Sequence, residues 1–202
     1  MATNKQIDAR YSLLLPYIKG KTILDLWVWD TTDRFLHSFL ASHAELCVGV
    51  ELDAERAMRL DKQWYTIVEW NAETVELERK FDVVVAWDLI EHVNNPWLLL
   101  ENVKKHLHPE WLFIFNTPNL YSINFLLLGL VHGGKVKQFE EHVNWYTEDL
   151  LKELLRRYNY SIHDFRYFSH PLHTRKSYII RSFWCISSSW LENMFVVATY
   201  NK

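Results

Sequence analysis

Five polar side chains follow apolar, strand-like segments of the sequence, each close to the point where its segment ends. They are Asp25, Glu51, Asn71, Asp88 and Asn116. In an open parallel sheet, ligands bind beyond the carboxyl ends of the strands, near the point where the strand order reverses. A single polar residue at such a place usually caps a helix or faces solvent. Five of them at one predicted edge indicate a binding site.

Glu51 has the position of an acid that binds a ribose. It follows the loop at Trp27 at about the 20-residue spacing typical of such acids. A carboxylate suits this task because its two oxygens accept hydrogen bonds from two adjacent hydroxyl groups. The spacing therefore predicts a cofactor that contains ribose.

The order of strand and helix patterns predicts the fold. Apolar runs typical of strands buried on both faces alternate with segments of helical spacing. This order predicts an α/β, Rossmann-like, doubly wound and mostly parallel seven-stranded sheet, with helices on both faces. The last two runs predict a hairpin-like pair that supplies a C-terminal antiparallel strand. The predicted strands are 22–26, 46–52, 65–69, 81–86, 112–116, 161–168 and 194–200, and the predicted helices are 34–42, 54–62, 96–106 and 147–157.

A long excursion interrupts this alternation before the last predicted helix. We expect a single domain over residues 1–202, with a lid or acceptor-site insertion at about 118–145, because long insertions in compact folds are often lids or binding loops. Its apolar segment, 120–132, is too short to span a membrane. A substrate lid, a dimer contact, a lipid-facing patch and an ordinary buried helix all stay open for this segment.

The overall composition argues against several classes of protein. A net charge of −3 gives no electrostatic basis for binding nucleic acid. The longest apolar stretches fall short of the roughly 20 residues that a membrane span needs. The two cysteines predict neither a disulfide framework nor a cysteine metal site. Residues 1–20 carry scattered charges rather than the zones of a secretory signal, which indicates a cytoplasmic protein.

At its motifs the chain resembles the class I S-adenosylmethionine-dependent methyltransferases over nearly its whole length. The resemblance rests on the segments TILDLWVWD, VGVELD, VEWNAE, FDVVVAWDLIEHVNNPWLLLENVKKHLHPEW and EHVNWYTEDLLKELL. Within these, DLIEHV and HVNWYTEDLL are similar to a branch of small bacterial and archaeal enzymes that often act on sugars, lipids or other small metabolites. The resemblance implies S-adenosylmethionine as the cofactor and a small-molecule, sugar or lipid acceptor that is methylated at oxygen.

The resemblance also implies which residues bind the cofactor. They would follow the cofactor from its methionine end to its adenine: Asp25, Trp27, Trp29 and Asp88 near the methionine and the sulfonium, Glu51 with Leu52 at the ribose, and Asn71 with Ala72 at the adenine.

The first loop departs from the family pattern of glycine, any residue, glycine. Average usage would give roughly 14 glycines in a chain of this length, whereas the chain has 5 Gly and 10 Trp. We hypothesise that the chain is an altered copy of a glycine-bearing methyltransferase, with tryptophan at the family's glycine positions. These positions are Trp27, Trp29, Trp64, Trp70, Trp87, Trp97, Trp111 and Trp190.

The exchange has physical consequences at the cofactor loop. Glycine reaches positive φ without strain, whereas a β-carbon in left-handed space costs roughly 1–2 kcal/mol. Two indoles at Trp27 and Trp29 would also fill the space of the methionine moiety. Two alternatives are that the tryptophans pack in the core, or that they form an aromatic cage for a cationic ligand.

A hydroxyl acceptor needs a base, and two histidines are candidates. His142 comes first because it follows the excursion that would cover the pocket, and His92 comes second, with a purely structural role at a helix start as its alternative. Neutral imidazole titrates in the useful range. We expect no metal site, because the remaining histidine pairs do not form a ligand set. These pairs are His106 with His108 and His170 with His173.

Two other functional classes compete with methyl transfer. A nicotinamide-dependent oxidoreductase shares the strand, the loop and the ribose-binding acid, but it needs a third glycine where Thr32 stands. A non-catalytic protein with the same fold and a cofactor pocket blocked by Trp27 and Trp29 is the stronger alternative.

Overall fold

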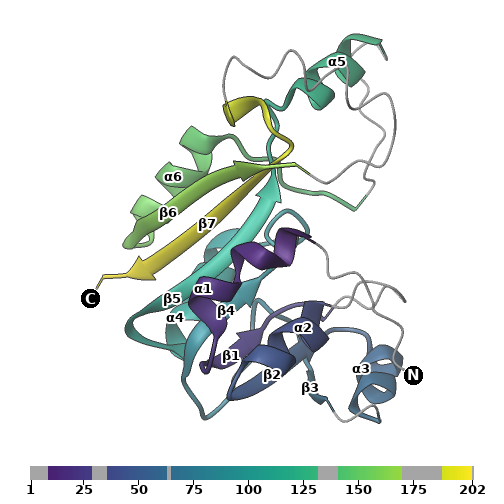
Figure 1. Ribbon diagram of the computed structural model, residues 1–202, viewed down its shortest axis with the longest axis vertical. Helices are drawn as coiled ribbons and strands as arrows, with labels where there is room; N and C mark the ends of the chain where they lie inside the picture. The colour runs from purple at the N-terminus through teal and green to yellow at the C-terminus, as the bar shows by residue number, and fades with distance from the viewer. Residues whose placement is uncertain (1–8, 29–35, 63–64, 132–140, 170–187, 202) are drawn as a thin grey trace.

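The computed structural model of the chain describes residues 9–28, 36–62, 65–131, 141–169 and 188–201. Seven strands form one sheet in the order β3-β2-β1-β4-β5-β7-β6 (Figure 1). The first five strands pair in parallel, and β7 runs antiparallel to both of its neighbours, β5 and β6. The predicted mostly parallel sheet with a C-terminal antiparallel strand is confirmed. The strands are β1 (Thr22–Asp25), β2 (Leu46–Glu51), β3 (Thr66–Glu69), β4 (Phe81–Ala86), β5 (Leu107–Pro118), β6 (Tyr160–Phe168) and β7 (Asn193–Tyr200).

The helices cover both faces of the sheet, as predicted. The predicted segment 96–106 matches its helix to the residue, whereas the start predicted at residue 34 lies outside the described residues. The elements are η1 (Ala9–Leu13), α1 (Leu15–Ile18), α2 (Leu36–His43), α3 (Ala54–Asp61), α4 (Pro96–His106), α5 (Ile123–Val131), α6 (Glu148–Arg157) and η2 (Ser188–Trp190).

Alternate side chains of the strands supply two hydrophobic cores, one on each face. Leu24 and Val84 pack with apolar side chains of α4 and α6, whereas their neighbours Ile23 and Val83 pack with η1, α1 and α2. This division follows from the two-residue period of a strand, which sends successive side chains to opposite faces. Burial of each such side chain contributes about 1.5–3 kcal/mol, so both helical layers are held firmly against the sheet.

Strand β5 begins earlier than the sequence predicts. The prediction placed its start at Leu112, but the strand already pairs at Leu107, which lies opposite Phe81. Leu112 then lies opposite Val83, so the intervening residues form an irregular stretch in β5. Glu110 in this stretch has a φ of 69°, in the left-handed region. The polar residues of this irregular stretch interrupt the apolar pattern, so the sequence did not predict the first part of the strand.

The strand order reverses between β1 and β4. From β1 the chain adds β2 and β3 on one side and β4 and β5 on the other. Sheets of this kind bind ligands beyond the carboxyl ends of the strands at such a reversal, which here lies between the loops that follow β1 and β4. Asp25 ends β1, and Asp88 follows the end of β4.

The excursion after β5 extends beyond the sheet. Its helix α5 lies apart from the other helices, at the upper right of Figure 1, and exposes Leu126, Leu127 and Leu130. Among the described residues, no helix is long and apolar enough to cross a membrane.

Helix α6 begins at a threonine cap, as predicted, and this cap can be tested. The Thr147 side chain accepts a hydrogen bond from the backbone N–H of Leu150 at 3.3 Å. We expect Thr147→Ala to lower the free energy of unfolding by about 1 kcal/mol, measured by urea denaturation. Thr147→Ser, which keeps the acceptor oxygen, is the matched control. An equal loss in both variants would contradict the capping role.

Candidate active site

Asp25 supports the first loop from below. Its carboxylate is fully buried and lies 3.0 Å from Nδ1 of the equally buried His37 on α2. The backbone N–H of Trp27 also donates to Asp25, at 3.5 Å. A buried carboxylate requires such partners, because burial of an unpaired charge is costly. Asp25 therefore orders the start of the loop through these two partners.

Glu51 lies at the carboxyl end of β2, where a ribose-binding acid is expected. Its side chain is nearly fully buried. One carboxylate oxygen accepts from the backbone N–H of Asp53 at 2.9 Å, and the other lies 3.3 Å from the guanidinium of Arg56. These two partners fix the carboxylate at the sheet edge.

The residues predicted at the adenine lie beside Glu51 along the same edge. The backbone N–H of Trp70 bonds to the carbonyl of Glu51 at 3.0 Å, which places the loop after β3 next to β2. Asn71 is exposed and accepts from the backbone N–H of Glu73, whereas Ala72 is buried. Leu52 is 68% exposed. The side chain of Leu52 is therefore available as an apolar surface for a ligand.

Asp88 and Asn116 form a reciprocal pair at the ends of β4 and β5. The backbone N–H of Asp88 donates to the side-chain oxygen of Asn116 at 2.8 Å, and the Asn116 amide donates to the Asp88 carboxylate. Asp88 has a φ of 49°, a conformation that residues other than glycine rarely adopt. The pair holds the backbone after β4 in this turn, which leads into the segment of Glu91 and His92.

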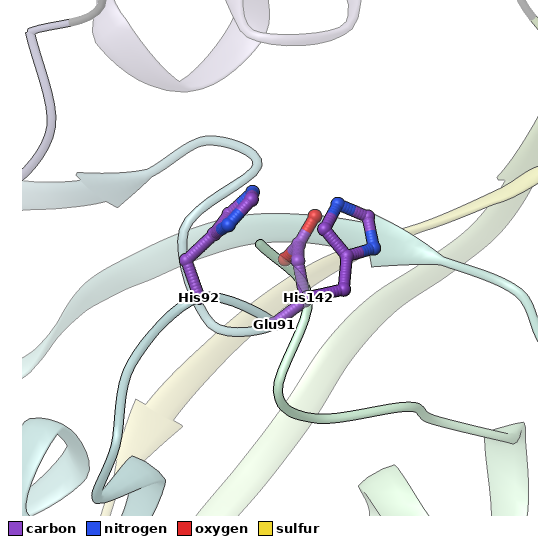
Figure 2. A group of neighbouring side chains, drawn as sticks. All are labelled: Glu91, His92 and His142. Carbon is purple, nitrogen blue, oxygen red and sulfur yellow. The ribbon is translucent and has the colours of Figure 1, made fainter. Parts of the chain in front are cut away.

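Three side chains that carry ligand or proton-transfer groups meet above this turn. They are Glu91, His92 and His142, and their donor atoms lie within 4.8 Å of one another. Figure 2 shows the three side chains rising together on one side of the backbone. Glu91 is 1% exposed, and the two histidines are half-buried. The structure thus brings together the two predicted catalytic histidines and adds the carboxyl group of Glu91 beside them.

Backbone hydrogen bonds hold the segment of His142 against the loop of Glu91. The N–H groups of Val143 and Asn144 both donate to the carbonyl oxygen of Glu91, each at 3.0 Å. Nδ1 of His92 lies 3.1 Å from the carbonyl oxygen of Glu141. Since a carbonyl only accepts, Nδ1 carries the proton and Nε2 keeps its lone pair.

The environment of this cluster changes the pKa values of its members. Burial, and the nearby negative charge of Asp88, raise the pKa of Glu91 to about 8. Burial, and to a smaller extent the charge of His92, lower the pKa of His142 to about 4. At neutral pH the cluster therefore contains a neutral imidazole beside a carboxyl group that is costly to ionise.

Trp27 lies directly beside this cluster. Its ring meets the ring of His92 edge to face, with 4.8 Å between the ring centroids, and it packs on the hydrophobic core below. Among the described residues, only Asp88, Glu110 and Asn159 combine a side chain with a positive φ. The strain expected from a β-carbon in left-handed space therefore does not arise at Trp27, and only the bulk of its indole bears on the loop.

The other tryptophans at predicted glycine positions have different environments. Trp87 is buried in the core, which fits the packing alternative, whereas three others are more than 40% exposed. Trp111 contacts the ammonium group of Lys21. Trp29 and Trp64 lie outside the described residues. The three exposed indoles are those of Trp70, Trp97 and Trp190.

A cavity of about 350 Å³ lies beyond the carboxyl end of β5. It is bounded by the start of α6, the end of β6 and η2, and Asn119 and Thr147 are among its lining residues. Tyr146, which precedes Thr147, pairs with Asn119. The lining of the cavity combines aromatic rings with two carboxylates. The rings are those of Tyr121, Tyr167 and Trp190, and the carboxylates are those of Glu148 and Asp149.

A family model described as a methyltransferase domain matches residues 32–164, more than half of the chain. The chain belongs to this methyltransferase family. The family predicted from the sequence is thereby confirmed. No curated protein matches the sequence significantly.

Solved structures of S-adenosylmethionine-dependent methyltransferases share the fold of this methyltransferase. One from Archaeoglobus fulgidus has 14% identity and a TM-score of 0.68, with 95% of this chain and 91% of that chain covered. One from Mesorhizobium loti has 18% identity and a TM-score of 0.64, with 94% and 95% covered. The 1,6-didemethyltoxoflavin-N1-methyltransferase of Burkholderia thailandensis, solved with S-adenosylhomocysteine, has 14% identity and a TM-score of 0.63, with 95% and 75% covered.

Two residues of the methyltransferase's site were missed by the sequence analysis. Glu91 stands in the quoted segment DLIEHV, and a signal for it was available, since it follows Asp88 by three residues and precedes His92 directly. His37 lies among the apolar residues of α2. A histidine in that place has no distinctive sequence signal, because its partner Asp25 is brought to it only by the fold.

The raised pKa of Glu91 predicts a pH dependence of stability. A carboxyl with a higher pKa in the folded chain contributes stability that is complete below its unfolded value of 4.5 and lost as the pH rises through about 8. We expect Glu91→Gln to remove this pH-dependent loss of stability, which is on the order of a few kcal/mol. The free energy of unfolding is measured by urea denaturation with EDTA present. Glu55→Gln, on the exposed face of α3, is the control. Equal pH slopes in both variants would contradict the burial of an ionisable Glu91.

Proposed function

We propose that this methyltransferase transfers a methyl group from S-adenosylmethionine to a hydroxyl oxygen of a small-molecule acceptor. The observation that carries the proposal is the position of the cluster of Glu91, His92 and His142. It lies after the carboxyl end of β4, beside the crevice at which the strand order reverses. Proton-accepting groups at that place serve a nucleophile that must lose a proton, as a hydroxyl does.

The cofactor assignment is supported by the order of side chains along the sheet edge. Asp25 and the backbone at Trp27 would lie at the methionine end, Glu51 with Leu52 at the ribose, and Asn71 with Ala72 at the adenine. Asp88 would lie near the sulfonium. The methyltransferase from Burkholderia thailandensis and the magnesium protoporphyrin IX methyltransferase from Synechocystis, which share this fold, were solved with S-adenosylhomocysteine.

The protein's main task in this reaction is positional. Methyl transfer from a sulfonium is an in-line displacement, so the rate depends on holding the nucleophile and the methyl group in attack geometry and on excluding water. The acceptor oxygen takes the methyl group, and its proton leaves to the cluster, where His142 and His92 are the accepting groups. The segment of His142 is fixed to the loop of Glu91 by backbone hydrogen bonds, which keeps the accepting group in place.

The acceptor would approach from the side of the excursion, residues 118–145. The cavity beyond β5 supports a small acceptor, because its volume of about 350 Å³ suits a compact molecule. Its aromatic rings stack on flat or sugar-like surfaces, and its carboxylates accept hydrogen bonds from hydroxyl groups. These features favour a polar acceptor such as a sugar or a small metabolite over a long lipid chain.

A catalytically impaired protein of the same fold is the second candidate. It is favoured by one observation, the indole of Trp27 beside His92. If this ring fills the methionine end of the crevice, the chain folds as a methyltransferase but does not bind the cofactor. The family match removes the support for the nicotinamide-dependent oxidoreductase.

Cofactor binding separates the two candidates. If the unchanged chain transfers methyl groups, we expect S-adenosylhomocysteine to bind it and Trp27→Gly/Trp29→Gly with similar, micromolar affinity in calorimetric titration. The impaired alternative instead predicts at least about tenfold weaker binding to the unchanged chain, a difference of about 1.4 kcal/mol. Trp97→Gly, at an exposed position on α4, is the matched control. Binding to neither protein would contradict the proposed cofactor site, and equal binding to both would eliminate the impaired alternative.

The role of His142 is tested by methyl transfer itself. With radiolabelled S-adenosylmethionine and a panel of hydroxyl and amine acceptors, we expect label in the hydroxyl acceptors and a loss of about 10²–10⁴-fold in kcat for His142→Ala. This comparison is made in the Trp27→Gly/Trp29→Gly background. His163→Ala controls for the loss of a histidine, since His163 lies on β6 and bonds to Thr199. Labelling of amines alone would contradict the assignment to oxygen.

A further inference from the structure

We propose that Glu91, His92 and His142 bind one divalent transition-metal cation of the Zn²⁺ type. Two imidazole nitrogens and one carboxylate oxygen are a ligand set that such cations prefer, and three protein ligands leave further coordination positions open for a substrate. The metal site itself is independent of the proposed function, whereas its role in methyl transfer, given below, rests on that function.

The spacing of the donor atoms is close to that of a metal site. The three donors lie within 4.8 Å of one another. Metal–ligand bonds of about 2.0–2.2 Å require the donors to approach to roughly 3–3.5 Å. We expect side-chain rotations to provide this closure, because Figure 2 shows the three side chains gathered close together.

Glu91 supplies the electrostatic argument for a cation. Its Oε2 is buried and makes no hydrogen bond within the described part of the chain. No described lysine or arginine forms an ion pair with Glu91, while the carboxylate of Asp88 adds a second negative charge nearby. Burial of a carboxylate without a compensating charge is costly. A bound cation would offset this cost for Glu91.

The histidines are prepared as ligands by their surroundings. Nδ1 of His92 donates to the carbonyl of Glu141, which fixes the ring and leaves Nε2 to bind a metal. A metal-bound histidine almost always makes such a bond with its other nitrogen. His142 is held over Glu91 by the hydrogen bonds of Val143 and Asn144.

No metal site was expected from the sequence, because the histidine pairs outside this cluster do not form a ligand set. His106 is engaged in the structure, since its Nε2 accepts from the backbone N–H of Leu77 at 3.0 Å. His170 and His173 lie outside the described residues. The sequence analysis did not combine Glu91 and His92 with His142, because the excursion separates them along the chain.

A cation at this place would change the role of His142 in methyl transfer. A hydroxyl oxygen bound to a divalent cation loses its proton more readily, because the cation stabilises the resulting anion. His142 would then act as a metal ligand rather than as the base. The displacement stays balanced: the acceptor oxygen gives its proton to solvent, bonds to the methyl carbon, and the sulfonium leaves as a neutral thioether.

Direct metal titration of the whole chain, without a histidine tag, tests the site. After removal of metal with EDTA and dialysis, Co²⁺ is added as a spectroscopic probe and Zn²⁺ is titrated by calorimetry. We expect one equivalent to bind, with visible Co²⁺ bands that Zn²⁺ displaces. Glu91→Gln and His142→Ala should each weaken binding by about 10–100-fold, and His163→Ala should not.

Circular dichroism and thermal melts serve to check that each variant is folded. His142→Ala changes a half-buried ring outside the sheet, so it provides the test if Glu91→Gln does not fold. Absence of binding, or binding that both variants retain, would overturn the proposal. Metal binding without methyl transfer would leave the metal site standing and contradict the proposed function. Methyl transfer by a chain that binds no metal would do the reverse.

Discussion

The carbonyl oxygen of Glu91 accepts backbone hydrogen bonds from Val143 and Asn144, and the rest of the candidate site depends on this junction. It joins the loop after β4 to the end of the excursion. These hydrogen bonds of Val143 and Asn144 fix the position of the neighbouring His142 relative to Glu91.

The first loop and this junction meet at Trp27. Below the loop, the buried pair of Asp25 and His37 holds the backbone, and above it the indole contacts His92. The same side chain thus covers one member of the cluster. Trp27 adopts an ordinary backbone conformation, so its β-carbon causes no backbone strain.

Strands β1, β2 and β4 were predictable because they are buried on both faces and are nearly continuous in apolar residues. Helix 96–106 was predictable from Pro96 and the helical spacing that follows it. The start of β5 was missed because polar residues and the left-handed Glu110 interrupt its apolar pattern. At the site, Glu51 and Asp88 follow from strand ends, whereas the contact of Glu91 with His142 depends on long-range hydrogen bonds that no local pattern encodes.

The most direct test of the account is a crystal structure of Trp27→Gly/Trp29→Gly grown with S-adenosylhomocysteine and Zn²⁺, with anomalous data collected at the zinc edge. The account predicts the ribose on Glu51, the sulfur facing the turn of Asp88, and one anomalous peak at about 2.0–2.2 Å from donors of Glu91, His92 and His142. S-adenosylhomocysteine bound away from the ends of β1 and β2, or a crevice that stays empty, would contradict the central claim that this sheet edge is a methyl-transfer site.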